Sequence, residues 1–245
     1  MESERWKVPP QGALIALCGL DGSGKTTQAQ LLEKRLMERR TVYRTRPVTA
    51  QFRDDPTLKA FLNQELSDAD MKDVVPELVL FSAMDRLRHM RTEMLPRMRD
   101  GAVVVSDRYV YSSYAWMVPR GIPDLDWVMQ LNRYLPEPQL TVYLDIPAEV
   151  AVDRIRSRGD KPRWEELDHD RMSQVRNIFL GREWGKDENY HVLDGQQPVH
   201  VLEEHIGRLA EAALQKRDAE LATVQKEEAL KETPTIPCAK VVGHG

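Results

Sequence analysis

The sequence predicts an α/β fold in which a parallel sheet carries helices on both faces. Two observations support this prediction. Short apolar runs alternate along the chain with longer segments of helical periodicity, which is the pattern of strands and crossover helices in a parallel sheet. The first run, residues 12–18, is apolar over its whole length, as expected for a strand that is buried on both faces. Right-handed crossovers then place the helices on both sides of the sheet.

Five segments have the pattern of strands. They are short and rich in valine, leucine, tyrosine or threonine, which favour strands, and several of them stop at a glycine or an aspartate. The last of the five has the weakest pattern. The expected strands are residues 12–18, 41–45, 102–106, 140–144 and 190–193.

Six longer segments have helical periodicity. Pro147 suits the first turn of its helix, because proline lacks the N–H group that would be unpaired there. From about Gln215 the large apolar residues become rare, which predicts a helix that protrudes from the fold, and residues 233–245 are expected to form a loose tail. The expected helices are residues 25–40, 76–98, 125–134, 147–157, 164–183 and 199–231.

The composition limits the classes to which this chain can belong. Its 245 residues carry 35 Lys and Arg against 39 Asp and Glu, a formal net charge of −4, and 41% of them are hydrophobic. These values fit one large globular domain better than two small ones, and a mildly acidic chain is a poor bulk binder of nucleic acid or of an anionic membrane. The N-terminal residues lack the apolar core of a signal peptide and no segment could span a bilayer, so we expect a cytoplasmic protein. Cys18 and Cys238 have no spacing that suits zinc or a disulfide framework.

The strongest motif is a glycine-rich loop between the first strand and the first helix. Residues 19–26 read Gly-Leu-Asp-Gly-Ser-Gly-Lys-Thr and match G-x-x-x-x-G-K-[ST]. In such a loop the backbone N–H groups surround a phosphate, Lys25 reaches the outer phosphates, and the Thr26 hydroxyl can bind Mg²⁺. The motif therefore predicts a nucleoside triphosphate site. It does not distinguish a kinase from a GTPase, an ATPase motor or a helicase.

A second motif follows the strand at residues 102–106. Asp107 and Arg108 come at the carboxyl edge of that strand, which is where open parallel sheets bind their ligands. Asp107 could organise Mg²⁺ and its waters, and the Arg108 guanidinium suits a phosphate group. The alternative is a turn at the end of a strand with a local ion pair.

Arginines are dense in two further places. One group lies along the helix that contains Arg86, and the other surrounds a Gly/Pro-containing loop near residue 160. A solvated charged face explains many such arginines. The loop at about residues 158–165 fits a lid better, because phosphoryl transfer needs mobile positive charge that covers the transferred group and excludes water.

With these motifs in place, the sequence resembles the thymidylate kinases over about residues 13–206. The resemblance rests on motifs in the family's order: residues 19–27, 83–89, 107–115, 140–147, 154–159, 163–165 and 175–176. It implies a three-layer P-loop NTPase fold with a five-stranded parallel sheet and a short lid. It also implies MgATP as the donor, dTMP as the acceptor and a homodimer. The kinase domain would comprise residues 1–214, followed by a helical extension and tail at residues 215–245.

The resemblance also implies roles for individual residues. The catalytic residues would be Lys25, Asp107, Arg108 and the lid arginine Arg163. Arg163 is included because Ser23, and not a basic residue, precedes Gly24, so the catalytic arginine would have to come from the lid. Thr26 and Asp107 would serve Mg²⁺. The donor site would comprise Gly19, Asp21, Gly22, Ser23, Gly24, Lys25, Thr26, Thr27, Arg158, Gln196 and Gln197. The acceptor site would comprise Asp21, Arg46, Phe81, Arg86, Arg108, Tyr109, Ser112 and Trp116, with Arg86 and Arg108 on the acceptor phosphate.

The departures from the family pattern lie on the acceptor side. Ser82 stands four residues before Arg86, where the family has an aromatic residue, and Phe81 is one position and therefore 100° away on a helix. Met117 stands where the family has a glutamine, and its thioether cannot both donate and accept hydrogen bonds. The segment after Arg46 also differs. Two alternatives therefore remain: a kinase of the same fold with another nucleotide or a non-nucleotide acceptor, and a nucleotide-binding module without phosphoryl transfer.

Overall fold

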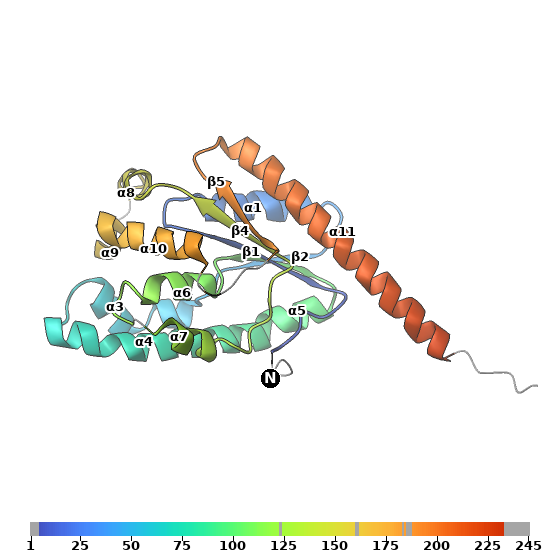
Figure 1. Ribbon diagram of the computed structural model, residues 1–245, viewed down its shortest axis with the longest axis horizontal. Helices are drawn as coiled ribbons and strands as arrows, with labels where there is room; N and C mark the ends of the chain where they lie inside the picture. The colour runs from blue at the N-terminus through green and yellow to red at the C-terminus, as the bar shows by residue number, and fades with distance from the viewer. Residues whose placement is uncertain (1–4, 123, 160–161, 183, 185–187, 233–245) are drawn as a thin grey trace, which may run out of the picture.

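The centre of the protein is one five-stranded sheet in which all strands are parallel. The computed structural model describes residues 5–122, 124–159, 162–182, 184 and 188–232. The strand order is β2-β3-β1-β4-β5, so the first strand lies in the middle (Figure 1). The prediction of an α/β fold with a five-stranded parallel sheet is confirmed. The strands are β1 (Ala13–Gly19), β2 (Val42–Thr45), β3 (Val103–Asp107), β4 (Leu140–Asp145) and β5 (Tyr190–Asp194).

Twelve helical segments surround the sheet in the described part of the chain. They include one π-helical turn, η2, which continues the long helix α4. In chain order they are α1 (Lys25–Leu36), α2 (Ala50–Arg53), α3 (Pro56–Leu62), α4 (Asp68–His89), η2 (Met90–Met94), α5 (Leu95–Arg99), α6 (Tyr111–Met117), α7 (Leu125–Leu131), α8 (Ala148–Arg156), α9 (Trp164–Leu167), α10 (His169–Gly181) and α11 (Val199–Glu232).

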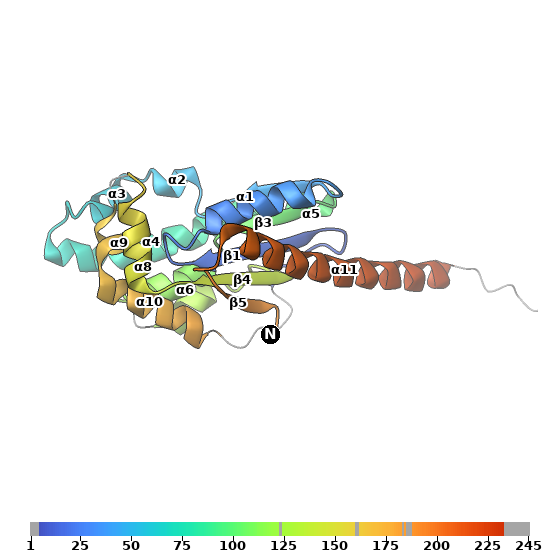
Figure 2. The ribbon, with the colours of Figure 1, turned by 90° about the horizontal axis from the view of Figure 1, so that it is seen from above.

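The two faces of the sheet have separate cores because side chains alternate along a strand. On β1, Ile15 and Leu17 pack with apolar residues of α1 and α11. Leu14 and Cys18 face the opposite way and join a larger core that includes residues of α4, α5, α6 and α10. In Figure 1, α1 and α11 lie above the sheet and α4, α5 and α6 lie below it, and Figure 2 looks down on the side of α1 and α11. These are the two helical layers that the apolar runs predict.

Several helices differ from the sequence-based expectation. The long helix begins at Asp68, not at Pro76, because Ser67 caps it by accepting a hydrogen bond from the Asp70 N–H at 3.2 Å. The expected helix at residues 164–183 is two helices, because the Asp168 carboxylate accepts a 3.0 Å bond from the Arg171 N–H and starts α10. The short helices α2, α3 and α6 were not predicted. Residue 183, residues 160 and 161 of the expected lid and the expected tail at residues 233–245 lie outside the described residues.

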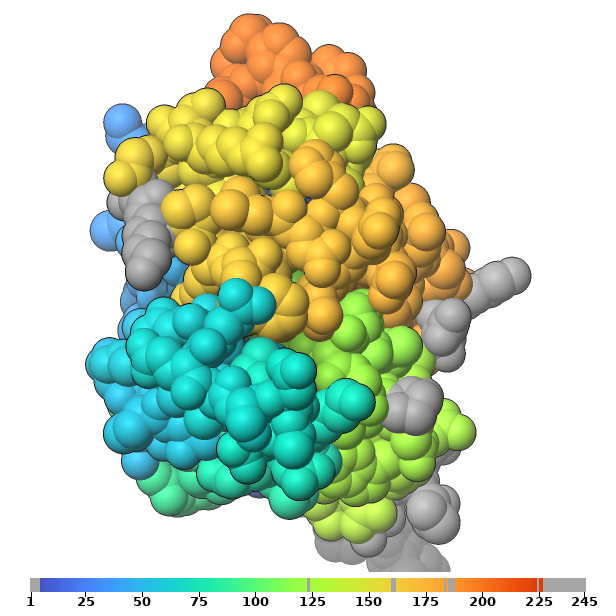
Figure 3. Space-filling view, turned by 90° about the vertical axis from the view of Figure 1, so that its left-hand side faces the viewer, coloured from blue at the N-terminus to red at the C-terminus, as the bar shows by residue number. Residues whose placement is uncertain are grey.

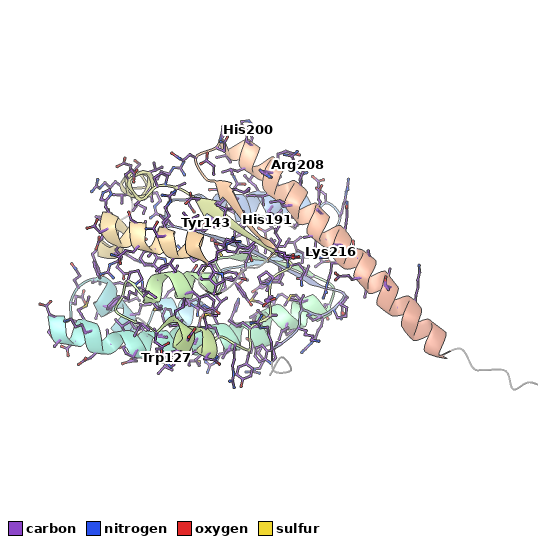
Figure 4. The ribbon with its side chains drawn as sticks, viewed as in Figure 1. Trp127, Tyr143, His191, His200, Arg208 and Lys216 are labelled. Carbon is purple, nitrogen blue, oxygen red and sulfur yellow. The ribbon has the colours of Figure 1, made fainter. Side chains whose placement is uncertain are left out.

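The last helix, α11, continues well beyond the body of the protein (Figures 1 and 2). In Figure 4, His200, Arg208 and Lys216 mark its course. Leu202, Ile206, Ala210 and Leu214 bury one side of its first half in the core. No described helix is long and apolar enough to cross a membrane.

Arg217 holds the middle of α11 to the body. Its guanidinium donates hydrogen bonds to the carbonyl oxygens of Val8 (2.7 Å), Pro9 (2.9 Å) and Gly12 (3.3 Å). The next residue, Asp218, accepts hydrogen bonds from Arg40. Beyond Asp218, the hydrogen bonds and ion pairs of the described side chains stay within the helix. We therefore propose that the part of the extension needed for stability ends near Asp218.

Truncation tests this boundary. A chain that ends at Glu220 keeps the unfolding temperature of the full chain to within about 2 °C, whereas a chain that ends at Gln215 loses about 5 °C or more. The difference follows because a hydrogen bond to a charged group contributes about 1.5–3 kcal/mol, and 1 kcal/mol corresponds to about 2–4 °C in a protein of this size. Thermal unfolding by circular dichroism measures both. Equal unfolding temperatures for the two truncated chains would contradict the proposed role of Arg217.

Candidate functional site

The glycine-rich loop lies at the carboxyl edge of the sheet, between β1 and α1. Its conformation requires glycine. Gly22 has a φ of 81°, and a Cβ atom there would lie 2.8 Å from the Ala151 carbonyl oxygen. Gly24 has a φ of 93° and is the N-cap residue of α1. The loop therefore offers backbone N–H groups and a helix N-terminus to an anion, as phosphate-binding loops do.

Lys25 is held inside this loop. Its ammonium group donates a hydrogen bond to the Leu20 carbonyl oxygen at 2.5 Å, and only 5% of the residue is exposed. Burial, followed by the positive charge of Arg108, lowers the pKa of Lys25 to about 7. Asp21 and Asp107 raise this pKa by less, so a phosphate group in the loop would add negative charge that stabilises the buried ammonium.

Thr26 and Asp107 lie together although they are far apart in the sequence. Asp107 ends β3, and its Cα pairs with that of Leu17 on β1, so its side chain reaches the loop. The Thr26 hydroxyl donates a hydrogen bond to Asp107 Oδ2 at 2.6 Å. The other oxygen, Asp107 Oδ1, is buried and accepts no hydrogen bond in the described structure. An unpaired carboxylate oxygen beside a threonine hydroxyl is a donor set that Mg²⁺ accepts, because this ion prefers oxygen ligands.

Asp21 and Arg108 form a mostly buried ion pair between the loop and the neighbouring cavity. Arg108 has a φ of 83°, which non-glycine residues seldom adopt, and this backbone conformation follows directly after β3. Burial raises the pKa of Asp21, but the positive charges of Arg108 and Lys25 outweigh it and hold that pKa well below its usual value. Asp21 is therefore an anion at neutral pH, fixed between two cations.

A cavity opens beside this ion pair. It brings together every predicted acceptor residue except Phe81, and the predicted lid arginine Arg163 lines it as well. Trp116 and Met117 of α6 form part of its apolar lining. The predicted acceptor residues that line it are Asp21, Arg46, Arg86, Arg108, Tyr109, Ser112 and Trp116.

Phe81 does not line this cavity, whereas Phe52 does. The two rings pack edge to face, with centroids 5.1 Å apart. Phe52, which the sequence analysis did not identify, comes from the short helix α2. Ser82 also lines the cavity, but its hydroxyl donates to the Val79 carbonyl oxygen at 2.9 Å within α4. Phe52 thus supplies an aromatic ring to the cavity where the sequence of α4 offers only a serine.

Arg86 is a buried cation in the wall of the cavity. Its guanidinium donates hydrogen bonds to Asn132 Oδ1 at 3.2 Å and to the Ser113 hydroxyl. No carboxylate of the described residues lies within ion-pair distance of it. Burial lowers its pKa to about 10, so it stays charged at neutral pH. The neighbouring Asp85 instead accepts hydrogen bonds from the N–H and the hydroxyl of Thr49, at 2.8 and 2.5 Å.

The remaining predicted donor residues lie around the rim of the loop. Arg158, Gln196 and Gln197 are exposed. Arg154 connects the segment after β5 to the loop, because its guanidinium donates to the carbonyl oxygens of Gly22 (3.3 Å) and Gly195 (3.1 Å). Gln197 donates to Asp194 Oδ2 at 3.1 Å, and Arg158 lies 3.9 Å from Glu166. A ligand that extends out of the loop would meet the exposed side chains of Arg158, Gln196 and Gln197 at this rim.

The arrangement brings two binding sites together at one edge of the sheet. The loop suits a chain of phosphates, and the cavity suits a flat, partly apolar group. Asp21 and Arg108 lie between them, so a phosphate from each side would meet at this pair. The geometry therefore suits transfer of a phosphoryl group from a ligand in the loop to a ligand in the cavity.

Comparison with known proteins agrees with this geometry. The family model described as thymidylate kinase matches residues 17–206. A probable thymidylate kinase of Pyrobaculum aerophilum is 36% identical over 185 residues, which cover 76% of this chain and 89% of that protein. Probable thymidylate kinases of Pyrococcus horikoshii (35% identical, 69% of this chain and 82% of that protein) and Archaeoglobus fulgidus (33%, 82% and 96%) are similar to it as well. This chain belongs to the thymidylate kinase family.

Proposed function

We propose that this protein transfers the γ-phosphoryl group of ATP to the 5′-phosphate of dTMP, which yields ADP and dTDP. The observation that carries the proposal is the position of Asp21 and Arg108, which belong at once to the edge of the phosphate loop and to the lining of the cavity. The match of most of the chain to the thymidylate kinase family and the names of its relatives support dTMP as the acceptor.

In this reaction an oxygen of the dTMP phosphate attacks the γ-phosphorus of ATP. The bond between that phosphorus and the bridging oxygen breaks, and the electron pair leaves with ADP. Catalysis rests on alignment and on charge stabilisation, because the protein forms no covalent bond to the phosphoryl group. Lys25 holds the outer phosphates of ATP, Arg108 holds the acceptor phosphate, and Arg163 stabilises the charge that develops on the transferred group. Arg86 supplies further hydrogen-bond donors within the cavity.

Mg²⁺ fits the residues at the end of β3. Asp107 has a buried oxygen without a partner, and the Thr26 hydroxyl lies beside the other oxygen of the same carboxylate. These two side chains would hold the ion, directly or through water, while the phosphates of ATP supply the rest of its ligands. The ion supplies positive charge to the β- and γ-phosphates. Among the described residues, no group of three or more His, Cys, Asp or Glu could hold a metal ion, so the ion would depend on the nucleotide for stable binding.

The cavity suits a pyrimidine base between apolar walls. Phe52, Trp116 and Met117 provide apolar contact, and the Ser82 hydroxyl is used within its own helix. Selection of the base would therefore depend on the shape of the cavity and on Arg86 rather than on an amide at residue 117. We assign the adenine of ATP to the exposed rim that Arg158, Gln196 and Gln197 form.

ADP release tests this function. The purified chain is incubated with MgATP and, in separate reactions, with each common nucleoside and deoxynucleoside monophosphate. We expect ADP to form in the presence of dTMP at a rate that exceeds the rate with any other acceptor by orders of magnitude. If ATP binds and ADP is released mainly with another nucleotide, that nucleotide would be assigned as the acceptor in place of dTMP. ATP binding without turnover on the whole panel would contradict the proposal.

We also propose that the protein acts as a homodimer in the cytoplasm. The support for a dimer is an apolar strip on the outside of α4, where Leu80 is 50% exposed and Met84, one turn later, is 39% exposed. Exposed apolar side chains that adjoin one another are typical of contact surfaces. The support for the compartment is the match of most of the chain to a family of kinases that act on nucleotides.

Replacing Leu80 with glutamate tests the dimer. We expect Leu80→Glu to convert the protein from dimer to monomer, because a charge would be buried in the contact. Size-exclusion chromatography with light scattering measures the mass. Leu180 on α10 is a matched control, since it is an exposed leucine (37%) on another helix, and Leu180→Glu should leave the dimer intact. A wild-type chain that is monomeric at micromolar concentration would contradict the dimer.

A further inference from the structure

We propose that Arg120 and Glu165 form a positioning pair that links the acceptor cavity to Arg163. Arg120 follows α6, which contributes the aromatic wall of the cavity, and Glu165 lies on α9 two residues after Arg163. The inference rests on the proposed function, because it concerns how that reaction depends on Arg163. It assigns to the pair a role that neither residue can perform alone.

The pair is bidentate and buried. Arg120 Nε donates to Glu165 Oε1 at 2.7 Å, and Arg120 Nη2 donates to Glu165 Oε2 at 2.6 Å. The exposed fractions of the two side chains are 15% and 3%. Parallel hydrogen bonds of this kind fix the relative orientation of both groups as well as their distance. The structure thus joins two segments at this point whose residues are 45 positions apart in the sequence.

On one side, Arg120 belongs to the acceptor cavity. It lines that cavity, and its guanidinium lies over the Trp116 ring, 5.4 Å from the centroid. It also lies 5.7 Å from the centroid of Phe61 on α3. A base that packs against Trp116 therefore acts on the same side chain that holds Glu165.

On the other side, Glu165 fixes the start of α9. This helix has only four residues, and Arg163 is its N-cap residue, whose N–H donates to Glu166 Oε2 at 3.0 Å. Since the helix is one turn long, its orientation and that of Arg163 depend on side-chain contacts. Glu165 makes the short, buried contact with Arg120, which lines the cavity, and it also lies 3.9 Å from Arg171, which does not. Both carboxylates of α9, Glu165 and Glu166, line that cavity.

Neighbouring contacts hold α9 against the same part of the protein. The Trp164 ring nitrogen donates to the Phe61 carbonyl oxygen at 3.3 Å, and Arg171 donates to the Pro119 carbonyl oxygen at 2.8 Å. Figure 3 shows the segments of α3 and α4 directly against those of α9 and α10 on this face. These contacts keep α9 folded, whereas the Arg120–Glu165 pair sets its angle to the cavity.

A buried ion pair is weak support for a purely stabilising role, because the cost of removing both charges from water offsets much of their attraction. The geometry of the Arg120–Glu165 pair is better suited to fixing the position of the groups attached to it. The exposed Arg163 side chain would otherwise sample many rotamers, and an error of about 1 Å in a catalytic group can lower a rate by about 10²-fold. We therefore expect loss of the pair to act on kcat through Arg163.

A double-mutant cycle in the full chain tests the pair. Glu165→Gln, Arg163→Met and the double variant are compared with wild type at saturating MgATP and dTMP, and dTMP binding is measured separately. We expect Glu165→Gln to lower kcat about tenfold with less than about a threefold change in the dTMP dissociation constant. In the Arg163→Met background the same change should produce no further loss, because residues that act as a unit are not additive. Losses that multiply in the double variant would overturn the proposal.

Further variants separate position from folding. Asp218→Asn removes the carboxylate of another arginine pair, Arg40–Asp218, and should leave kcat unchanged. Arg120→Lys keeps the charge but loses the two parallel hydrogen bonds, so it should lower kcat less than Glu165→Gln and also have no effect in the Arg163→Met background. A kcat for Arg120→Lys that equals the wild-type value overturns the need for bidentate geometry and hence the pair. An active wild-type chain with an additive cycle overturns this inference alone, whereas a wild-type chain that is inactive with all nucleotides overturns the proposed function with it.

Discussion

Replacing Lys25 with methionine lowers kcat for dTMP-dependent ADP formation by about 10²–10³-fold. The side chain of methionine fills similar space but has no charge for the outer phosphates, and the loss of one preorganised donor to a developing anion costs about 10²–10³-fold. Steady-state ADP release at saturating substrates measures the change. A variant that retains more than a tenth of the wild-type kcat would contradict the assignment of Lys25.

The change in unfolding temperature of Lys25→Met can be predicted in direction and serves as the folding control. Wild-type Lys25 is a buried cation. Burial lowers its pKa to about 7, so its positive charge is unfavourable in the nucleotide-free fold. Lys25→Met removes that charge, and its unfolding temperature should equal or exceed that of wild type. Loss of activity together with unchanged or higher stability would separate catalysis from folding.

The same pKa predicts how ATP binding depends on pH. In the free protein, Lys25 loses its proton as the pH rises through about 7. The phosphates of ATP raise the pKa of the lysine again, because a nearby negative charge favours the ammonium form. Binding above pH 7 therefore takes up a proton, and the affinity for ATP falls between pH 7 and pH 9. Calorimetry in buffers of different ionisation enthalpy measures this proton uptake. In Lys25→Met the uptake should be smaller by the contribution of the lysine ammonium group.

The sequence predicts the donor edge of the site well because backbone chemistry restricts it. A loop that binds phosphate through N–H groups needs glycines at fixed positions, and those positions are visible in residues 19–24. The central strands β1, β3 and β4 are equally visible, because a strand buried on both faces is mostly apolar. Thus both the positions of the strands along the chain and the position of Lys25 can be derived without a structure.

The acceptor side depends on contacts between segments that are distant in the chain, and the sequence therefore predicts fewer of its residues. The helix α2 has only four residues, too few for a periodic pattern, so nothing in the sequence indicates that Phe52 lines the cavity. The contact between Arg120 and Glu165 joins residues that lie 45 positions apart. Asp168 has the residue type of a helix cap, and recognition of that signal would have divided the expected helix at residues 164–183.

Replacing Phe52 with alanine lowers kcat/KM for dTMP by about 10–10²-fold, because contact of a base with an aromatic ring contributes about 1–3 kcal/mol. The effect should appear mainly in the KM for dTMP and leave the KM for ATP nearly unchanged, since Phe52 lines the acceptor cavity. Steady-state kinetics with each substrate varied in turn measures both. An equal rise in the two KM values would indicate a general disturbance of the site.

Phe81 provides the matched control for this prediction. It has the same ring and lies 5.1 Å from Phe52, measured between the ring centroids, but it does not line the cavity. Phe81→Ala should therefore reduce kcat/KM for dTMP several-fold less than Phe52→Ala. Its main effect should be a lower unfolding temperature, because it leaves a void behind Phe52. If instead Phe81→Ala had the larger effect on dTMP, α4 would have to turn by about one residue when the acceptor binds, since one helical position corresponds to 100°. The two alanine variants thus decide which aromatic ring contacts the base.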